Sequence, residues 1–254
     1  MDVAETTFVE LPSNGRRYES SARVRLADVT ARGRFRLDAL ARVLQDLSAD
    51  DTADAGLSND TVWVLRRLAL EIGGLPRYRQ SFALRTWCSG TGPRWAERRS
   101  DMTVDGVVQV RAAAIWAATS AETLAPVAPG ADFTAAYREA AGTRRVSARL
   151  TLPTLPSHTT AAPVAVRPWV LRAADIDLLA HVNNASYWSS IEESLVDDVR
   201  PIRHAVIEFR DGVMLDEAVD VHEVRTADTL MQWWMADGRV RATMAVVFAA
   251  TPGS

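Results

Sequence analysis

The chain has 254 residues, 48% hydrophobic and 24% charged, with a formal net charge of −3. This composition supplies enough apolar side chains for a core and excludes a disordered chain. The near-neutral charge argues against a dedicated nucleic-acid binder. Arg or Asp interrupts every apolar stretch before the ~18 residues that span a bilayer, so no membrane insertion is expected. The first residues lack the basic and apolar regions of a secretory signal, and a soluble, cytoplasmic protein is predicted.

Several reactive side chains are scarce or absent. All 29 basic residues are Arg, which excludes a Schiff-base lysine and a phosphate-binding loop lysine. The single cysteine, Cys88, excludes an internal disulfide, and its apolar surroundings predict a buried side chain rather than a nucleophile. The four histidines lack the spacing of metal ligands, so neither a metal nor an organic cofactor is expected.

The first half of the chain predicts one strand, one long helix and four further strands. Residues 18–27 alternate apolar and polar side chains, as a half-buried strand does. Residues 36–55 place leucines at helical spacing, and Gly56 ends the pattern. The four further strands are predicted at 61–72, 79–89, 94–104 and 107–118. Asp105-Gly106 between the last two is typical of a hairpin turn.

The second half repeats this order after a proline-punctuated stretch. Residues 125–163 are interpreted as a linker along the surface, with one short helix at 132–141. A strand is then predicted at 166–174 and a helix at 184–199. Four strands are predicted to follow, at 203–210, 218–226, 229–236 and 239–249.

The repeated order indicates an internal duplication. Asp105-Gly106 precedes Trp116, and Asp237-Gly238 precedes Phe248 at the same interval. The pattern predicts an α+β fold in which each half wraps a sheet around a helix, with both sheets joined into one. The predicted division is 1–124, a linker at 125–163, and 164–254.

The densest polar stretch, Asp175 to Tyr187 (DIDLLAHVNNASY), lies at the junction of the second strand and the second helix. Backbone amides at a helix start favour an anion, and would assist a reaction that develops an oxyanion. We interpret Asp177 as a nucleophile or base, and His181 as a group that polarises the substrate or carries a proton. A structural alternative is that Asn183 or Asn184 only caps the helix.

The pattern Asp-x-Asp-x-x-x-His-Val-Asn-Asn-x-x-Tyr resembles the signature of hotdog-fold thioesterases, including the 4-hydroxybenzoyl-CoA type. The whole chain resembles the acyl-acyl-carrier-protein thioesterases, which carry two hotdog units in one polypeptide. The first half contributes GRFRLDALARVLQD (33–46), WVLRR (63–67), RTWCSG (85–90) and WAERR (95–99) to this resemblance. The resemblance implies two tandem hotdog units and hydrolysis of fatty-acyl thioesters to a free acid and a thiol.

Within this resemblance, Asp177 is the catalytic carboxylate and His181 assists it. The backbone amides of Val182 and Asn183 are expected to hold the thioester oxygen. Plant-type members carry a catalytic Asn where this chain has Leu179, and a Glu where it has Gly212. Whether Asp211, next to Gly212, replaces that Glu stays open.

The duplication also predicts that one half is inactive. Aligning Asp28 with Asp175 places Thr30 opposite Asp177 and Arg34 opposite His181. Thr and Arg cannot replace a carboxylate and an imidazole in this chemistry. Residues 1–124 are therefore predicted to be catalytically silent and to line the acyl pocket.

The substrate is expected to be attached to acyl carrier protein. An acyl-CoA thioesterase is the alternative within the same class, and a non-catalytic acyl-binding protein is the alternative outside it. The non-catalytic alternative is motivated by Leu179 and Gly212, which stand where plant-type members carry a catalytic Asn and Glu. Because two units pair within the chain, a monomer or a homodimer is expected.

Overall fold

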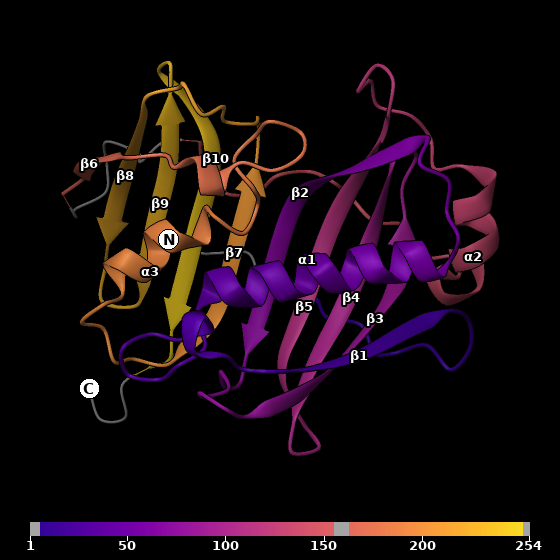
Figure 1. The fold of residues 1–254 in the computed structure, drawn as a ribbon, viewed down its shortest axis with the longest axis horizontal. Coiled ribbons are helices and arrows are strands. Elements are labelled where there is room, and N and C mark those ends of the chain that lie inside the picture. The colour runs from indigo at the N-terminus through magenta and orange to yellow at the C-terminus, as the bar shows by residue number, and fades with distance from the viewer. Residues whose placement is uncertain (1–5, 155–162, 251–254) are drawn as a thin grey trace.

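The computed structural model describes residues 6–154 and 163–250. Its central element is one antiparallel sheet of ten strands in the order β1-β3-β4-β5-β2-β7-β10-β9-β8-β6 (Figure 1). The strands are β1 Arg17–Arg23, β2 Thr61–Ile72, β3 Ser81–Thr91, β4 Trp95–Val104, β5 Val107–Ser120, β6 Ala165–Trp169, β7 Ile202–Phe209, β8 Val219–Arg225, β9 Thr229–Ala236 and β10 Arg239–Phe248. β2 pairs with β7 in the middle of the sheet, so both halves share it. This confirms the predicted α+β fold with one continuous sheet.

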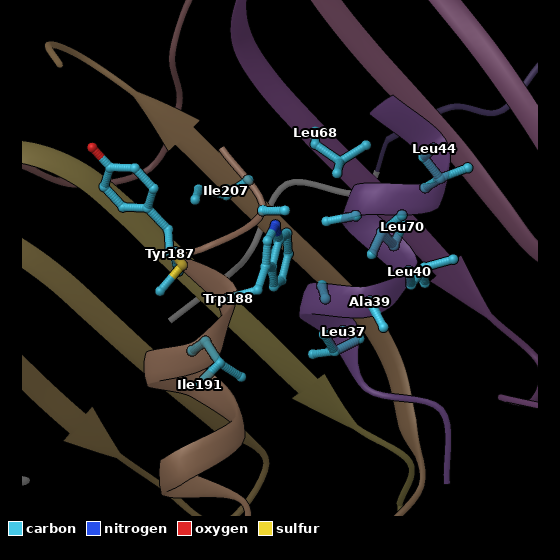
Figure 2. Close-up of a cluster of buried hydrophobic side chains, with 14 of the residues drawn as sticks. Leu37, Ala39, Leu40, Leu44, Leu68, Leu70, Tyr187, Trp188, Ile191 and Ile207 are labelled. Carbon is cyan, nitrogen blue, oxygen red and sulfur yellow. The ribbon is translucent and has the colours of Figure 1, made fainter. Parts of the chain in front are cut away.

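The helices that cover the sheet are unequal in length. α1 (Leu37–Asp54) and α3 (Trp188–Ser194) lie on one face of the sheet, and α2 (Ala131–Ala141) lies beyond the far end of α1 (Figure 1). Leucines of α1, Trp188 of α3 and Ile207 of β7 share one hydrophobic core (Figure 2). No helix of the described part is both long and apolar enough to cross a membrane.

The second helix is shorter than the predicted range 184–199. Before it, the Asn183 side chain accepts a hydrogen bond from the Ala185 amide at 2.9 Å and forms a turn. After it, the Asp198 carboxylate accepts hydrogen bonds from the amide and the guanidinium of Arg200. Short acidic and amide side chains compete in this way with helical backbone hydrogen bonds. Val199, which the sequence places on the apolar helix face, is exposed.

The first strand of each half also ends earlier than predicted. Strands were expected at 18–27 and 166–174, but β1 ends at Arg23 and β6 at Trp169. A short 3₁₀ turn follows each one, at Leu26–Asp28 and at Ala173–Asp175. In both turns the last Asp accepts a hydrogen bond from a preceding Arg amide, which turns the chain out of the sheet.

The loops after these turns have the same hydrogen bonds in both halves. In the first half, the Thr30 amide donates to the Arg34 carbonyl at 2.8 Å. In the second half, the Asp177 amide donates to the His181 carbonyl at 2.9 Å. The register that aligns Asp28 with Asp175 therefore holds in three dimensions.

The stretch predicted to be a surface linker contributes to the core. α2 buries Phe133 and Tyr137, both on the side that faces α1 and the sheet. Beyond α2 the chain crosses the other face of the sheet, where the fully buried Glu208 accepts the amides of Thr151 at 2.7 Å and Leu152 at 2.9 Å. The end of the predicted linker, 155–162, lies outside the described residues.

Candidate active site

Asp177 lies in the loop between the 3₁₀ turn Ala173–Asp175 and α3. The buried Asp175 carboxylate accepts hydrogen bonds from the Arg172 amide at 2.9 Å and its guanidinium at 2.7 Å, so its role is to anchor the loop. Asp177 Oδ1 accepts the Leu179 amide at 2.9 Å. Asp177 Oδ2 has no hydrogen-bond partner in the described part of the chain, which leaves this oxygen available to a substrate.

Asp177 lines a cavity of about 400 Å³. Leu179 and Asn184 lie at the same end, and α1 lines the cavity from Gln45 to Ala53. At a rise of 1.5 Å per residue, that part of α1 is about 12 Å long. The cavity is therefore elongated along α1, with the Asp177 carboxylate at one end.

α2 lines the far end of the cavity through Phe133. The rings of Phe133 and Trp63 lie 4.9 Å apart and both line the cavity. Arg98 also lines this end, and it bonds to Tyr137 of α2 at 3.3 Å and to the buried carboxylate of Asp51. The predicted linker region thus supplies the wall opposite Asp177, which sequence periodicity alone did not indicate.

Cys88 lines the same cavity but is not poised to react. Burial raises the pKa of its thiol to about 11. Since the thiolate is the nucleophilic form, the thiol is inert near neutral pH. This agrees with the prediction of a buried, structural cysteine.

Two amide side chains stand beside Asp177 in the cavity. Asn184 Nδ2 lies 3.5 Å from Gln45 Oε1, so the pair joins the second half to α1 of the first half. Sequence analysis gave Gln45 no role and treated Asn184 as a possible helix cap. The structure gives the capping contact to Asn183 and leaves Asn184 facing the cavity.

His181 faces a different cavity from Asp177. It lines a space of about 520 Å³ together with Asp211, Gly212, Glu217 and Arg241. A Cβ atom added at Gly212 would lie 2.7 Å from His181 Cδ2, so the imidazole occupies the space of any side chain there. Asp211 Oδ2 accepts Arg241 at 2.7 Å, and Asp211 does not line the cavity of Asp177.

The two amides expected to hold the thioester oxygen are already occupied. The Val182 amide donates to the Val213 carbonyl, and the Asn183 amide donates to the Asp175 carbonyl, both at 2.7 Å. This geometry does not support an oxyanion contact through them. The side-chain amide of Asn184 is a hydrogen-bond donor that does line the cavity beside Asp177.

The described residues contain no group of three or more His, Cys, Asp or Glu side chains arranged to hold a metal ion. Two carboxylates line the cavity, Asp177 and Glu97. Glu97 already accepts hydrogen bonds from Arg99 at 2.9 Å and Arg144 at 2.5 Å, which leaves Asp177, with the neighbouring amide groups, as the carboxylate available for chemistry.

Comparison with protein families identifies the chain. The model of the acyl-ACP thioesterase N-terminal domain matches residues 15–137, and that of the C-terminal domain matches residues 161–241. The chain belongs to the acyl-ACP thioesterase family. An uncharacterized protein of Mycobacterium tuberculosis is 25% identical to it, with 94% of both chains covered. Oleoyl-acyl carrier protein thioesterase 1 of Arabidopsis thaliana is 23% identical, covering 86% of this chain and 66% of the plant protein.

Solved structures share the tandem hotdog fold. A protein from Lactobacillus plantarum described as an oleoyl thioesterase (putative) superposes with a TM-score of 0.81 at 21% identity, covering 96% of this chain and 100% of that one. The 12:0-ACP thioesterase from Umbellularia californica gives a TM-score of 0.77 at 14% identity, covering 94% and 100%. These similarities confirm the predicted fold.

Proposed function

We propose that this member of the acyl-ACP thioesterase family hydrolyses fatty-acyl thioesters of acyl carrier protein, using Asp177 as the catalytic carboxylate. Family membership makes the chain a thioester hydrolase. The observation that supports the assignment of Asp177 is its place at one end of the elongated cavity, with Oδ2 free of hydrogen bonds to the described residues.

In this proposal the acyl chain lies along α1 and the thioester carbonyl stands between Asp177 and Asn184. The ionised Asp177 carboxylate either attacks the carbonyl carbon or takes a proton from the water that attacks it. The carbon–sulfur bond breaks, the thiolate leaves and is protonated, and the fatty acid is released. Asn184 donates a hydrogen bond to the developing oxyanion. His181 assists in this proposal as a positioning residue, since its backbone carbonyl accepts the Asp177 amide while its side chain lines the neighbouring cavity.

The proposal also assigns different tasks to the two halves. In the first half, Thr30 stands at the position equivalent to Asp177 and has no carboxylate. Arg34 stands at the position equivalent to His181 and forms an ion pair with Glu192 at 2.6 Å. The same register places Glu192 opposite Gln45. Residues 1–124 would therefore bind the acyl chain without catalysis, residues 125–163 link the halves, and residues 164–254 carry the active site.

The single-site proposal is tested with Asp177→Asn and the matched control Thr30→Ala. Asp177→Asn should lower kcat for thiol release by about 100-fold or more, because it removes the base or nucleophile but keeps the shape. Thr30→Ala should retain most activity. Similar losses in both variants would contradict the single site, and acyl binding by the wild type without thiol release would favour a non-catalytic protein.

A single turnover in ¹⁸O-labelled water tests whether Asp177 acts as the nucleophile. Attack by the carboxylate forms a mixed anhydride, whose hydrolysis leaves one labelled oxygen either in Asp177 or in the fatty acid. Base catalysis places the label only in the fatty acid. Label that mass spectrometry finds in the peptide containing Asp177 therefore establishes attack by the carboxylate, whereas label found only in the fatty acid is the result of base catalysis or of water attack at the acyl carbon of the anhydride.

We also propose a preference for acyl carrier protein over CoA, and a monomer or homodimer as the working form in the cytoplasm. The match to the family models supports acyl carrier protein as the carrier of the substrate. The pairing of two hotdog units within one chain supports a monomer or a homodimer. Comparing kcat/KM for one acyl chain on both carriers tests the first of these points.

A further inference from the structure

A small cavity opens beside the acyl cavity. Its volume is about 20 Å³, and Gln45, Ser48, Trp116 and Asn184 line both spaces. Its other walls are largely apolar and include Leu44, Leu65, Leu68, Ala112, Ala114 and Ala185. A space of this size accommodates a single water molecule or a group of similar size. We call it the side cavity.

Two buried hydrogen-bond donors of the side cavity have no partner. Nε1 of Trp116 and Nε1 of Trp188 are both buried and make no hydrogen bond to any described residue. Trp188 is 0% exposed and projects from the start of α3 toward α1 (Figure 2). Buried polar groups without a partner are uncommon, and two that line one cavity indicate that an acceptor belongs there.

The serine hydroxyls of the side cavity complete its hydrogen-bonding pattern. Ser48 Oγ donates to the Leu44 carbonyl at 2.9 Å, and Ser100 Oγ donates to Thr86 Oγ1 at 3.1 Å. Both serines have therefore used their hydrogens but can still accept a hydrogen bond. The side cavity thus combines N–H donors with hydroxyl acceptors, which is the pattern that fits a hydroxyl group.

We propose that the side cavity binds a hydroxyl group of the acyl chain, so that hydroxyacyl thioesters are preferred substrates. The hydroxyl belongs within the first few carbons, because the side cavity is lined by Gln45 and Asn184, the neighbours of Asp177 in the acyl cavity. With an unsubstituted chain, a water molecule fills the side cavity instead. This inference rests on the proposed function.

The test compares three thioesters of the same acyl carrier protein: decanoyl, 3-hydroxydecanoyl and 10-hydroxydecanoyl. We expect kcat/KM for the 3-hydroxy substrate to exceed that for decanoyl about tenfold, or about 1.4 kcal/mol. The 10-hydroxy substrate should show no gain, because its hydroxyl lies at the other end of the chain. Equal values for decanoyl and 3-hydroxydecanoyl would overturn the proposal and leave water as the occupant.

Trp116→Phe and Trp188→Phe each remove an indole N–H and keep an aromatic ring. Each should reduce the tenfold preference to about twofold or less. Trp87→Phe is the matched control, because the Trp87 indole N–H is also buried without a partner but Trp87 lines neither cavity. Trp87→Phe should keep the tenfold preference for the 3-hydroxy substrate. If that preference survives in both Trp116→Phe and Trp188→Phe, the proposal is overturned.

The outcomes also separate this inference from the proposed function. If decanoyl thioester is hydrolysed and the activity depends on Asp177, but the 3-hydroxy substrate has no advantage, only the side-cavity proposal fails. If none of the three thioesters is hydrolysed, the proposed function fails. Because the substrate comparison uses the wild-type chain, it stands even if a Trp variant does not fold.

Discussion

Single backbone positions decide which groups can reach the substrate. Gly212 lies under the His181 ring, so the Glu that plant-type members carry at this position has no space here. The motif correctly indicated a strand-to-helix junction with Asp177 at a cavity. It did not indicate that the Val182 amide is used by Val213, because this bond depends on how β7 and the loop meet in space.

Gly212→Ala tests the packing of His181 on this backbone. The new Cβ would lie 2.7 Å from His181 Cδ2, so the ring must move. We expect a loss of about 1–3 kcal/mol in unfolding free energy, as for other overpacking changes, together with reduced kcat. Urea unfolding and thiol-release kinetics measure the two effects. Unchanged kcat in a destabilised variant would remove His181 from the catalytic proposal.

At the scale of elements, helix length depends on contacts that periodicity does not reveal. The spacing of Trp188, Ile191 and Leu195 correctly predicts a helix with one buried face. The same spacing extends the prediction to Val199, although α3 ends at Ser194 and Asp198, beyond that end, binds Arg200 and Arg225. In the first half α1 continues to Asp54, which lets it line the whole cavity.

Asp198→Asn tests the contribution of the ion pairs that follow α3. Hydrogen bonds from Arg200 hold the pKa of the Asp198 carboxyl below its usual value. Because the pKa is lower in the folded state, the ionised Asp198 stabilises the protein at pH values above the unfolded-state pKa of about 3.9. This stabilisation is lost as the pH falls through the folded-state pKa. We expect Asn to cost roughly 0.5–1 kcal/mol at pH 7 and progressively less as pH falls below the unfolded-state pKa of about 3.9.

Urea unfolding of wild type and Asp198→Asn at several pH values between 7 and 3.5 measures this difference. A cost that is independent of pH would show that the variant acts through packing and not through the charge of Asp198. Asp228→Asn is a suitable control, since Asp228 accepts no side-chain hydrogen bond among the described residues.

On the scale of the whole molecule, the halves are not independent bodies. β2 and β7 pair from Arg67 opposite Glu208 to Glu71 opposite His204. One hydrophobic cluster includes residues of both halves, among them Leu40, Leu68 and Ile207. The repeated order of elements was enough to predict the joined sheet. It was not enough to predict which side chains face the cavity, since that depends on strand bulges and on α2.

We therefore expect one cooperative unfolding transition for the full chain. Tryptophan fluorescence and far-ultraviolet circular dichroism should give the same urea midpoint, because exposing the core of one half removes packing from the other. Two separated transitions would contradict a shared core and would indicate that each hotdog unit folds alone.

Two of the side-chain contacts between the halves differ in strength, one on the side proposed to be inactive and one beside the candidate active site. On the inactive side, Arg34 of the first half holds Glu192 of the second through two hydrogen bonds of 3.1 and 2.6 Å, and Glu192 also accepts the Leu37 amide. On the active side, the corresponding contact is the single 3.5 Å amide pair of Gln45 and Asn184. A parting of α1 from α3 that admits a substrate would therefore open beside Asp177 and pivot on the ion pair. Under the proposed division of tasks, the half without a catalytic carboxylate would hold the pivot while the other half admits the substrate.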